Sequence, residues 1–438
     1  MKSISLFQGI VIGIFAVVAL IGLYVFATYT STGGENAIGT VTIWGTLPAA
    51  DLSVGLLAAT RDERSLKNVT YIEKDAAALP SDLASAIATG AAPDLVLASQ
   101  EELLALAPFL APIPLATLSA RTFASSFAEG GALFTIPSNG GYYGVPLLID
   151  PIVLFYNRAI LASSGIATPP STWEALTGLV PKVATLTASR QITRGLIALG
   201  TYDNVHNARS ILSTLFLQTS APVSARAATG VISADLGLAS PSGGGTPPGQ
   251  AVVRFYTQFT DPTKVSYTWN ASLPNSQSAF QTGDLALYLG FVSEARYLAS
   301  AAPNLDFDVA PVPQPATAAN KTTYGLTYAL MIPTGAKNAN GAYAAAILLT
   351  HVPAQLALAS ATGLAPASRA ALASEVPADP VAATASVSAL YAVGWLSPLP
   401  ADTDTIFSAM IGNVISGRYV LGEALATAER SLSALLRH

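Results

Sequence analysis

The sequence contains no cysteine among its 438 residues, and this absence excludes several kinds of chemistry. Without thiols the chain can form no disulfide, no thiolate metal site and no cysteine nucleophile. It also lacks the acylated cysteine that anchors bacterial lipoproteins, so attachment to a membrane would need another segment. Histidine is nearly as rare, and His206 and His351 cannot alone form a histidine-rich metal site. We therefore predict no metal site and no cofactor.

Charged residues are also few, at 11% of the chain, with 21 basic against 26 acidic residues and a formal net charge of −5. No basic run interleaved with aromatic residues is present, so nucleic acid is not a predicted partner. The P-loop, HExxH and GxSxG motifs are missing as well. The acidic residues are scattered, and a catalytic carboxylate pair cannot be recognised without distances. We therefore predict that the protein is not an enzyme.

A long uncharged stretch, Leu6 to Thr30, lies near the N-terminus and follows Lys2. A bilayer span needs about 20 apolar residues, whereas the apolar region of a cleaved secretory signal has about 7–15. The length favours an uncleaved transmembrane helix, with a cleaved signal as the alternative. Lys2 and the terminal amine favour a cytoplasmic N-terminus. We therefore expect a single-pass protein of the cell membrane whose main body, residues 40–438, lies on the extracytoplasmic side.

The segments that follow alternate strand, helix and strand, which is typical of a parallel α/β unit. Thr40 to Gly45 (TVTIWG) and Ala92 to Ser99 (APDLVLAS) read as short buried strands, and SDLASAIATG before the second reads as a helix. Ligands of parallel sheets gather at the carboxyl ends of the strands. The residues at these two strand ends, Gly45, Thr46, Ser99 and Gln100, are therefore binding candidates.

The stretch Tyr142 to Arg158 (YYGVPLLIDPIVLFYNR) reads as an extended, largely apolar crossing that contains Asp150. An unpaired charge in an apolar run is costly, so Asp150 must find hydrogen-bond partners. The sequence leaves two kinds of partner open for Asp150: a hydroxyl group of a ligand, or a group of the protein itself. Shortly afterwards, PPSTWEAL predicts a helix start with Ser171 as the N-cap and Glu174 closing a capping box.

Segments spread over most of the chain resemble one family when they are taken in order. They are TVTIWG, DLASAIATGAAPDLVLAS, YGVPLLIDPIVLFYNRAILASSGIATPPSTWEAL, AFQTGDLALYLGF, DFDVAPVPQP and VISGRYVLGEALATAERSLSALL, within residues 40–435. This order resembles the extracellular solute-binding proteins of ABC importers, especially the carbohydrate-binding subgroup that includes maltose-binding protein. The resemblance implies an α/β, two-lobed periplasmic-binding-protein-like fold with hinge strands, preceded here by the N-terminal transmembrane helix.

The resemblance also implies a domain division and a set of partners. Residues 1–39 would be the membrane anchor and spacer, residues 40–149 with 313–366 the first lobe, and residues 150–312 with 367–438 the second. Two such lobes close around a small solute, most consistent with a carbohydrate, and present it to ABC permease subunits. The chain departs from the family in having no lipid-anchor cysteine, a role that Leu6 to Thr30 could take over.

Further candidates follow from the positions that the resemblance assigns to the pocket. Asn204 and His206 lie in a polar loop, Trp269 could offer a ring face to sugar C–H groups, and Phe291 and Glu294 follow the strand LALYLG. A charge at a helix N-terminus is the alternative role of Glu294. Tyr324, after the second proline-rich crossing, belongs to the hinge or to the pocket. With the strand-end residues and Asp150, these complete the predicted ligand-binding set.

The ligand remains open within this class. An oligosaccharide is the leading prediction, and a polyamine, phosphonate, amino acid or metal chelate on the same fold is the rival. A cationic ligand would call for clustered carboxylates, which Asp203, Asp402 and Asp404 could supply. An anionic ligand would call for arginine forks or helix N-termini. A membrane-anchored surface sensor or enzyme is the alternative from a different class.

Overall fold

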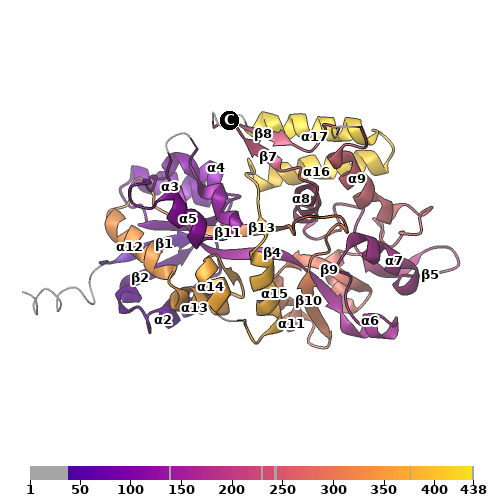
Figure 1. Cartoon of the computed structure of the whole chain (residues 1–438), viewed down its shortest axis with the longest axis horizontal. Helices are drawn as coiled ribbons and strands as arrows, with labels where there is room; N and C mark the ends of the chain where they lie inside the picture. The colour runs from indigo at the N-terminus through magenta and orange to yellow at the C-terminus, as the bar shows by residue number, and fades with distance from the viewer. Residues whose placement is uncertain (1–37, 138–139, 228–229, 241–243, 375, 437–438) are drawn as a thin grey trace, which may run out of the picture.

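The computed structural model describes residues 38–137, 140–227, 230–240, 244–374 and 376–436. They form two α/β bodies that lie side by side and are joined by long strands (Figure 1). The first body carries the early strands, and the second carries most of the later helices. The membrane helix expected within Leu6 to Thr30 lies outside the described residues.

The sheet of the first body begins with the parallel unit expected from the sequence. β1 (Val41–Gly45) pairs in parallel with β2 (Val69–Glu73) and with β3 (Leu95–Ser99), which confirms the predicted strand–helix–strand rhythm. β11 (Thr323–Met331) runs antiparallel to β3 and continues the sheet toward β4. Gly45 ends β1 where only glycine fits, because a Cβ there would lie 2.7 Å from the carbonyl oxygen of Leu97.

The stretch Tyr142 to Arg158 contains β4 (Gly144–Asn157), the strand that links the two bodies. Its first half pairs with β11, and its second half pairs with β9 (Leu285–Phe291) and β10 (Phe307–Pro311). The main path of the sheet runs in the order β2-β1-β3-β11-β4-β9-β6-β5, and three further strands pair with β4 or β11 beside this path. The side chains of β4 are buried on both faces of the sheet along nearly the whole strand, which explains its apolar sequence.

Helices cover the sheet of the first body. They are α2 (Ala49–Ala59), α3 (Leu79–Ala88), α4 (Leu103–Leu106), α5 (Ala120–Ser126), α12 (Ala339–Leu349), α13 (Val352–Thr362) and α14 (Arg369–Ser374), with 3-10 turns η1 (Arg64–Asn68), η2 (Ala107–Phe109) and η3 (Glu129–Phe134). The short strand β12 (Ala365–Pro366) pairs with β4. A hydrophobic cluster beneath α2, α12 and α13 forms the part of the core that belongs to this body alone.

The second body is built on β9 and its parallel neighbour β6 (Ile192–Ile197). Its other elements are α6 (Arg158–Ser163), α7 (Trp173–Val183), β5 (Thr185–Leu186), α8 (Ala208–Gln218), β7 (Val223–Arg226), β8 (Ile232–Asp235), α9 (Pro248–Thr257), η4 (Gln258–Thr260), α10 (Ser276–Thr282), α11 (Glu294–Ala301), α16 (Pro400–Ile415) and α17 (Leu421–Leu436). α15 (Pro380–Ala389) and β13 (Ala392–Val393) lie between the bodies, where β13 pairs with β11.

The start of α7 differs from the expected capping box. Thr172 is the N-cap, and its Oγ1 accepts a hydrogen bond from the backbone N–H of Ala175 at 3.2 Å. The Glu174 carboxylate instead accepts from the N–H of Ala316 at 3.1 Å, a residue far along the chain. The expectation for Ser171 was therefore wrong, because Thr172 caps equally well and a tertiary contact recruits the glutamate.

Among the described residues, no single helix is both long and apolar enough to cross a membrane. The pair α12 and α13 passes that test together by length and composition, with a bend of 78° between the two helices.

Candidate functional site: a polar cavity beside the hinge

A polar cavity of about 420 Å³ lies in the second body at the start of α8. The loop that follows β6 and the start of α8 supply most of its wall, and Asn275, the end of β9 and the helix α16 supply the rest. β6 and β9 are parallel neighbours, so their carboxyl ends place both segments at the same edge of the sheet. The lining residues are Tyr202, Asp203, Val205, His206, Asn207, Ala208, Arg209, Ser210, Asn275, Phe291 and Asp404.

Arg209 connects this cavity to the first body through an ion pair with Glu101. Both guanidinium Nη atoms donate to the carboxylate, Nη1 to Oε1 and Nη2 to Oε2, the latter at 2.9 Å. Glu101 follows β3, and its Oε1 also accepts from the hydroxyl of Tyr324 on β11. Burial and the neighbouring Glu101 carboxylate raise the pKa of Tyr324 well above its ordinary value, so its hydroxyl remains a donor. Residues of both bodies therefore shape the electrostatics of the cavity.

Asp404 and Tyr202 form a second polar pair in the cavity wall. The hydroxyl of Tyr202 donates to Oδ1 of Asp404 at 2.6 Å, and Arg209 Nε lies 3.4 Å from the same oxygen. Burial, together with the adjacent carboxylate, raises the pKa of Tyr202, which keeps its phenol protonated. Next to Tyr202, Asp203 accepts from the hydroxyl of Ser408, which lies one turn beyond Asp404 on α16, at 2.9 Å.

Glu294 organises the loop beneath the cavity. Its carboxylate accepts from Asn207 Nδ2 at 2.6 Å, from Gln277 Nε2 at 2.7 Å and from the N–H of Phe291 at 2.8 Å, and also from the Tyr288 hydroxyl. His206, which lines the cavity and is half-exposed, approaches it at 3.8 Å. With this many donors, Glu294 holds the loop and the end of β9 in place and has little capacity left for a ligand.

Two of the predicted residues, His206 and Phe291, therefore line the cavity, whereas Trp269 and Asn204 support it from below. Trp269 is only 1% exposed, and its Nε1 donates to Asn204 Oδ1 at 3.3 Å. The Asn204 amide in turn donates to the carbonyl oxygens of Asn270 and Leu273 at 2.9 and 3.0 Å. The Trp269 ring is thus core, and it presents no face to the cavity.

Ser99 ends β3, Gln100 follows it, and the polar groups of both side chains are occupied. The Gln100 amide donates to the carbonyl of Gly325 at 3.1 Å and accepts from the N–H of Thr327 at 2.6 Å, which ties the end of β3 to β11. The Ser99 hydroxyl donates to Glu102 at 2.7 Å. These contacts position Glu101, which lies between Gln100 and Glu102.

Asp150, Gly45, Thr46 and Tyr324 do not line the cavity either. Asp150 is 4% exposed on β4 and accepts from the N–H of Ser293 at 3.1 Å. Burial raises the pKa of Asp150 to about 7. Of the two partners left open by the sequence, the structure supplies the protein group. The Tyr324 ring packs edge-on against Phe291, with centroids 6.3 Å apart, so it supports the cavity through that aromatic side chain.

The predicted set missed four residues that the geometry emphasises: Glu101, Tyr202, Arg209 and Asp404. Glu101 directly follows two predicted residues, and a charge at a strand end in a chain with few charges is the signal that would have identified it. Arg209 lies inside a helix and carries no such signal.

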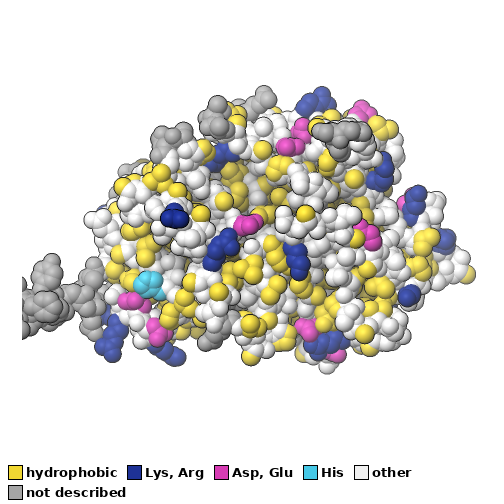
Figure 2. Space-filling view, in the orientation of Figure 1, with side chains coloured by type: hydrophobic (Ala, Val, Ile, Leu, Met, Phe, Trp, Pro, Cys, Tyr) yellow, Lys and Arg dark blue, Asp and Glu magenta, His cyan; other side chains and the backbone are white. Residues whose placement is uncertain are grey.

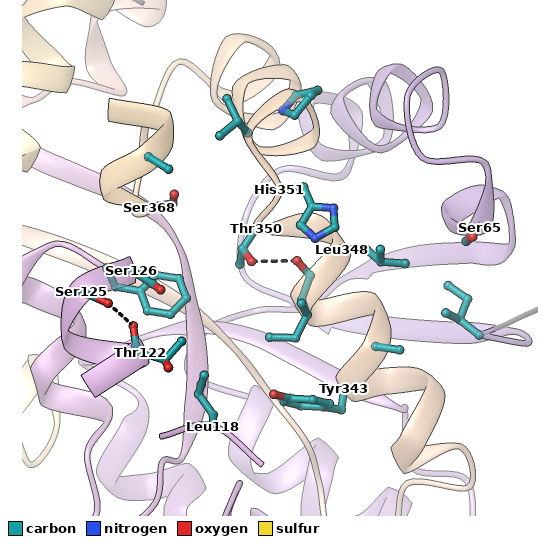
Figure 3. A pocket seen from close by; sticks show the side chains of 17 residues that line it. Ser65, Leu118, Thr122, Ser125, Ser126, Tyr343, Leu348, Thr350, His351 and Ser368 are labelled. Carbon is teal, nitrogen blue, oxygen red and sulfur yellow. Dashed lines mark hydrogen bonds between the residues drawn. The ribbon is translucent and has the colours of Figure 1, made fainter. Parts of the chain in front are cut away.

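A larger cavity of about 1140 Å³ lies on the first body. Figure 3 shows its walls, with Thr122, Ser125 and Ser126 of α5 on one side and Leu348, Thr350 and His351 at the turn between α12 and α13 on the other. None of the described residues that line it is Asp, Glu, Lys or Arg. Its lining is therefore apolar with small hydroxyl groups, and it lacks the charged pairs of the cavity beside the hinge.

Charge is sparse elsewhere on the molecule too. On the face shown in Figure 2, Lys, Arg, Asp and Glu side chains stand singly or in small groups, separated by uncharged surface. In the part of the chain that the structure describes, no group of three or more His, Asp or Glu side chains could hold a metal ion.

The fold and the sequence can be compared with known proteins. The family model described as bacterial extracellular solute-binding protein matches residues 65–385. No curated protein matches the chain in sequence. Among solved structures, a cyclo/maltodextrin-binding protein complexed with maltotetraose has a TM-score of 0.72 at 16% identity, covering 90% of this chain and 96% of that one.

Two further structures show the same similarity of fold. The cyclic alpha-maltosyl-1,6-maltose binding protein from Arthrobacter globiformis has a TM-score of 0.72 at 16% identity, covering 91% of this chain and 99% of that one. The GacH receptor of Streptomyces glaucescens has a TM-score of 0.66 at 18% identity, with 91% and 98% covered. Because the family model spans most of the sequence, the chain belongs to the family of bacterial extracellular solute-binding proteins.

Proposed function

We propose that the chain is the extracytoplasmic substrate-binding component of an ABC importer and that it binds an oligosaccharide in the cavity beside the hinge. The observation that carries the proposal is the composition of that cavity: hydroxyl, amide and carboxylate groups beside the ring of Phe291, at the carboxyl ends of β6 and β9. Sugar hydroxyls need both donors and acceptors, and the apolar face of a sugar ring packs against an aromatic side chain.

The ligands of the structural neighbours support the same ligand class. They include proteins bound to maltotetraose, to acarbose and to maltotriose. For this chain we propose that the two bodies correspond to lobes of residues 40–149 with 313–366 and residues 150–312 with 367–438, hinged at β4 and β11. Residues 1–39 would anchor the lobes to the membrane next to the permease. Closure around the ligand would follow from a rotation about those strands.

A cationic ligand is the second candidate, because two carboxylates, Asp203 and Asp404, line the cavity. A polyamine would place its ammonium groups against them. A sugar would use the same oxygens as acceptors for its hydroxyl groups, in charge-assisted hydrogen bonds. The two candidates differ in salt dependence, since Coulombic attraction between exposed charges is screened whereas the packing of a sugar on Phe291 is not.

The test is a thermal-shift screen of the purified extracytoplasmic part with maltotriose, maltotetraose, acarbose and spermidine, followed by calorimetry of each hit. A ligand at 100 times its Kd adds about 2.7 kcal/mol to stability, which is readily measured. We expect a glucan to stabilise the protein, Phe291→Ala to weaken its binding, and Trp173→Phe, outside the cavity, to leave it unchanged. Stabilisation by spermidine alone, lost at high salt, would establish the cationic ligand instead. No response to any glucan or to spermidine would overturn the proposal.

A further inference from the structure

The pair formed by Glu101 and Arg209 joins residues that are 108 positions apart and belong to different bodies. Both side chains are largely buried, with 7% of the glutamate and 15% of the arginine exposed. A bidentate pair of this kind fixes the plane of the guanidinium as well as its position. The orientation of an arginine in the wall of the cavity therefore depends on a carboxylate from the opposite body.

Glu101 is rigidly mounted on the first body. Its backbone N–H donates to the Ser99 hydroxyl at 3.1 Å, and its Oε1 accepts from the hydroxyl of Tyr324. The neighbouring Gln100 amide is fixed between Gly325 and Thr327 of β11. The carboxylate is therefore held by β3 and β11, and it cannot follow Arg209 if the two bodies move apart.

Arg209, in contrast, has little to hold it within its own body. It is the second residue of α8, and its Nε is buried without a hydrogen-bond partner among the described residues, although Asp404 Oδ1 lies 3.4 Å away. Its Nη atoms are directed to Glu101. Without that carboxylate the guanidinium would be drawn to Asp404 or into the cavity.

We propose that Glu101 is a positioning residue that aims Arg209 in the cavity from across the hinge, so that the binding site is assembled only when the two bodies are together. The pair also determines the charge that the site accepts, because Arg209 is the one Lys or Arg among the described residues that line the cavity, and the carboxylates of Glu101 and Asp404 both lie against its guanidinium. The site therefore selects neutral sugars over anionic ones. This inference rests on the proposed function for the identity of the ligand.

Two measurements test the pair. The first is a double-mutant cycle of Glu101→Gln and Arg209→Gln, with calorimetry of maltotriose binding. Loss of a charged hydrogen bond weakens binding by about ten- to a hundredfold, and we expect this for each single variant. Because Glu101 acts through Arg209, the double variant should bind no more weakly than Arg209→Gln alone. Independent, additive losses would overturn the inference.

The second measurement needs no glucan. Glu101→Gln removes the bidentate partner of Arg209 and leaves only the Asp404 carboxylate beside its Nε, so this variant should be stabilised in a thermal-shift assay by glucose 6-phosphate, to which the wild type and Arg209→Gln should not respond. A wild-type-like lack of response in Glu101→Gln would count against the pair as the determinant of charge. Failure of maltotriose to bind the wild type would instead remove the proposed function while leaving this result to stand.

The control is Arg158→Gln, which removes the same charge from an ion pair that lies within the second body and links the start of α6 to β10. Arg158 Nη2 lies 2.6 Å from Asp308 Oδ2, and neither residue lines the cavity. We expect neither maltotriose affinity nor the glucose 6-phosphate response to change in this variant.

A second variant keeps the inference testable if Glu101→Gln fails to fold because it buries an unpaired arginine. Arg209→Lys keeps the charge but loses the bidentate geometry, and it should still weaken maltotriose binding at least about tenfold. Wild-type affinity in a folded Arg209→Lys would refute the positioning role.

Discussion

Replacing Asp150 by asparagine tests how this buried residue affects the stability of the protein at different pH values. The carboxyl group is buried on β4, where it accepts a hydrogen bond from the N–H of Ser293 at 3.1 Å. Burial raises its pKa from the ordinary value of 3.8 to about 7. The native state therefore keeps a proton on Asp150 over a pH range in which the unfolded chain has lost it.

The sign of the pH dependence follows from this proton. Between about pH 4 and pH 7 the native state binds more protons than the unfolded state, so the free energy of unfolding falls as the pH rises. A shift of about three pKa units corresponds to about 4 kcal/mol over that interval, or about 1.4 kcal/mol for each pH unit. The asparagine side chain of the variant would be neutral at every pH and would still offer a carbonyl oxygen to Ser293.

Urea unfolding followed by tryptophan fluorescence at several values from pH 4 to pH 8 measures the difference between the variant and the wild type. Between about pH 4 and pH 7, we expect the free energy of unfolding of Asp150→Asn to rise by about 4 kcal/mol relative to that of the wild type. Glu102, whose pKa burial also raises to about 7, is present in both proteins and cancels in the comparison. Asp62→Asn, an exposed position, provides the control. Parallel profiles for Asp150→Asn and the wild type would refute the reasoning, and so would an advantage that grows toward low pH.

Two other predictions concern the core and the membrane. Trp269→Ala should lower the free energy of unfolding by about 3–5 kcal/mol in the same urea assay, because the ring is 1% exposed; a change below about 1 kcal/mol would show that the ring is not core. The uncharged stretch Leu6 to Thr30 should keep the protein in the membrane fraction, with residues 40–438 accessible to protease from outside. Recovery of a released species that begins near residue 30 would instead establish a cleaved signal.

Local sequence patterns predicted the fold well, because strand formation and helix capping depend mainly on residues that are close together in the sequence. The β-branched run at β1 and the apolar run at β3 became parallel neighbours, as the strand–helix–strand spacing required. Gly283 is the C-cap of α10 in the left-handed conformation, with φ at 82°, which glycine adopts without steric cost. The N-cap of α7 was misplaced by one residue, because Ser171 and Thr172 cap equally well and Glu174 is engaged by Ala316 in the tertiary structure.

The candidate site was less predictable, since its chemistry depends on contacts between distant segments. Strand ends drew attention to Ser99 and Gln100, yet the side chain that reaches Arg209 in the cavity wall from there is that of Glu101. The sequence also could not tell that the Trp269 ring turns into the core and hydrogen-bonds Asn204. Those outcomes follow from packing of the second body, which no local pattern encodes.

Because charged residues are few in this chain, the burial of the Glu101–Arg209 ion pair calls for an explanation. Removing two charges from water costs several kcal/mol for each ion, and a buried ion pair is often no more stabilising than apolar residues of the same shape. A chain with only 11% charged residues nevertheless places Glu101 and Arg209 together at a mostly buried boundary between two bodies. Stability alone is therefore a poor explanation for the pair. A fixed guanidinium, with its charge balanced from the other side of the hinge, is instead what a site needs if it is to recognise a neutral polar solute only when both bodies surround it.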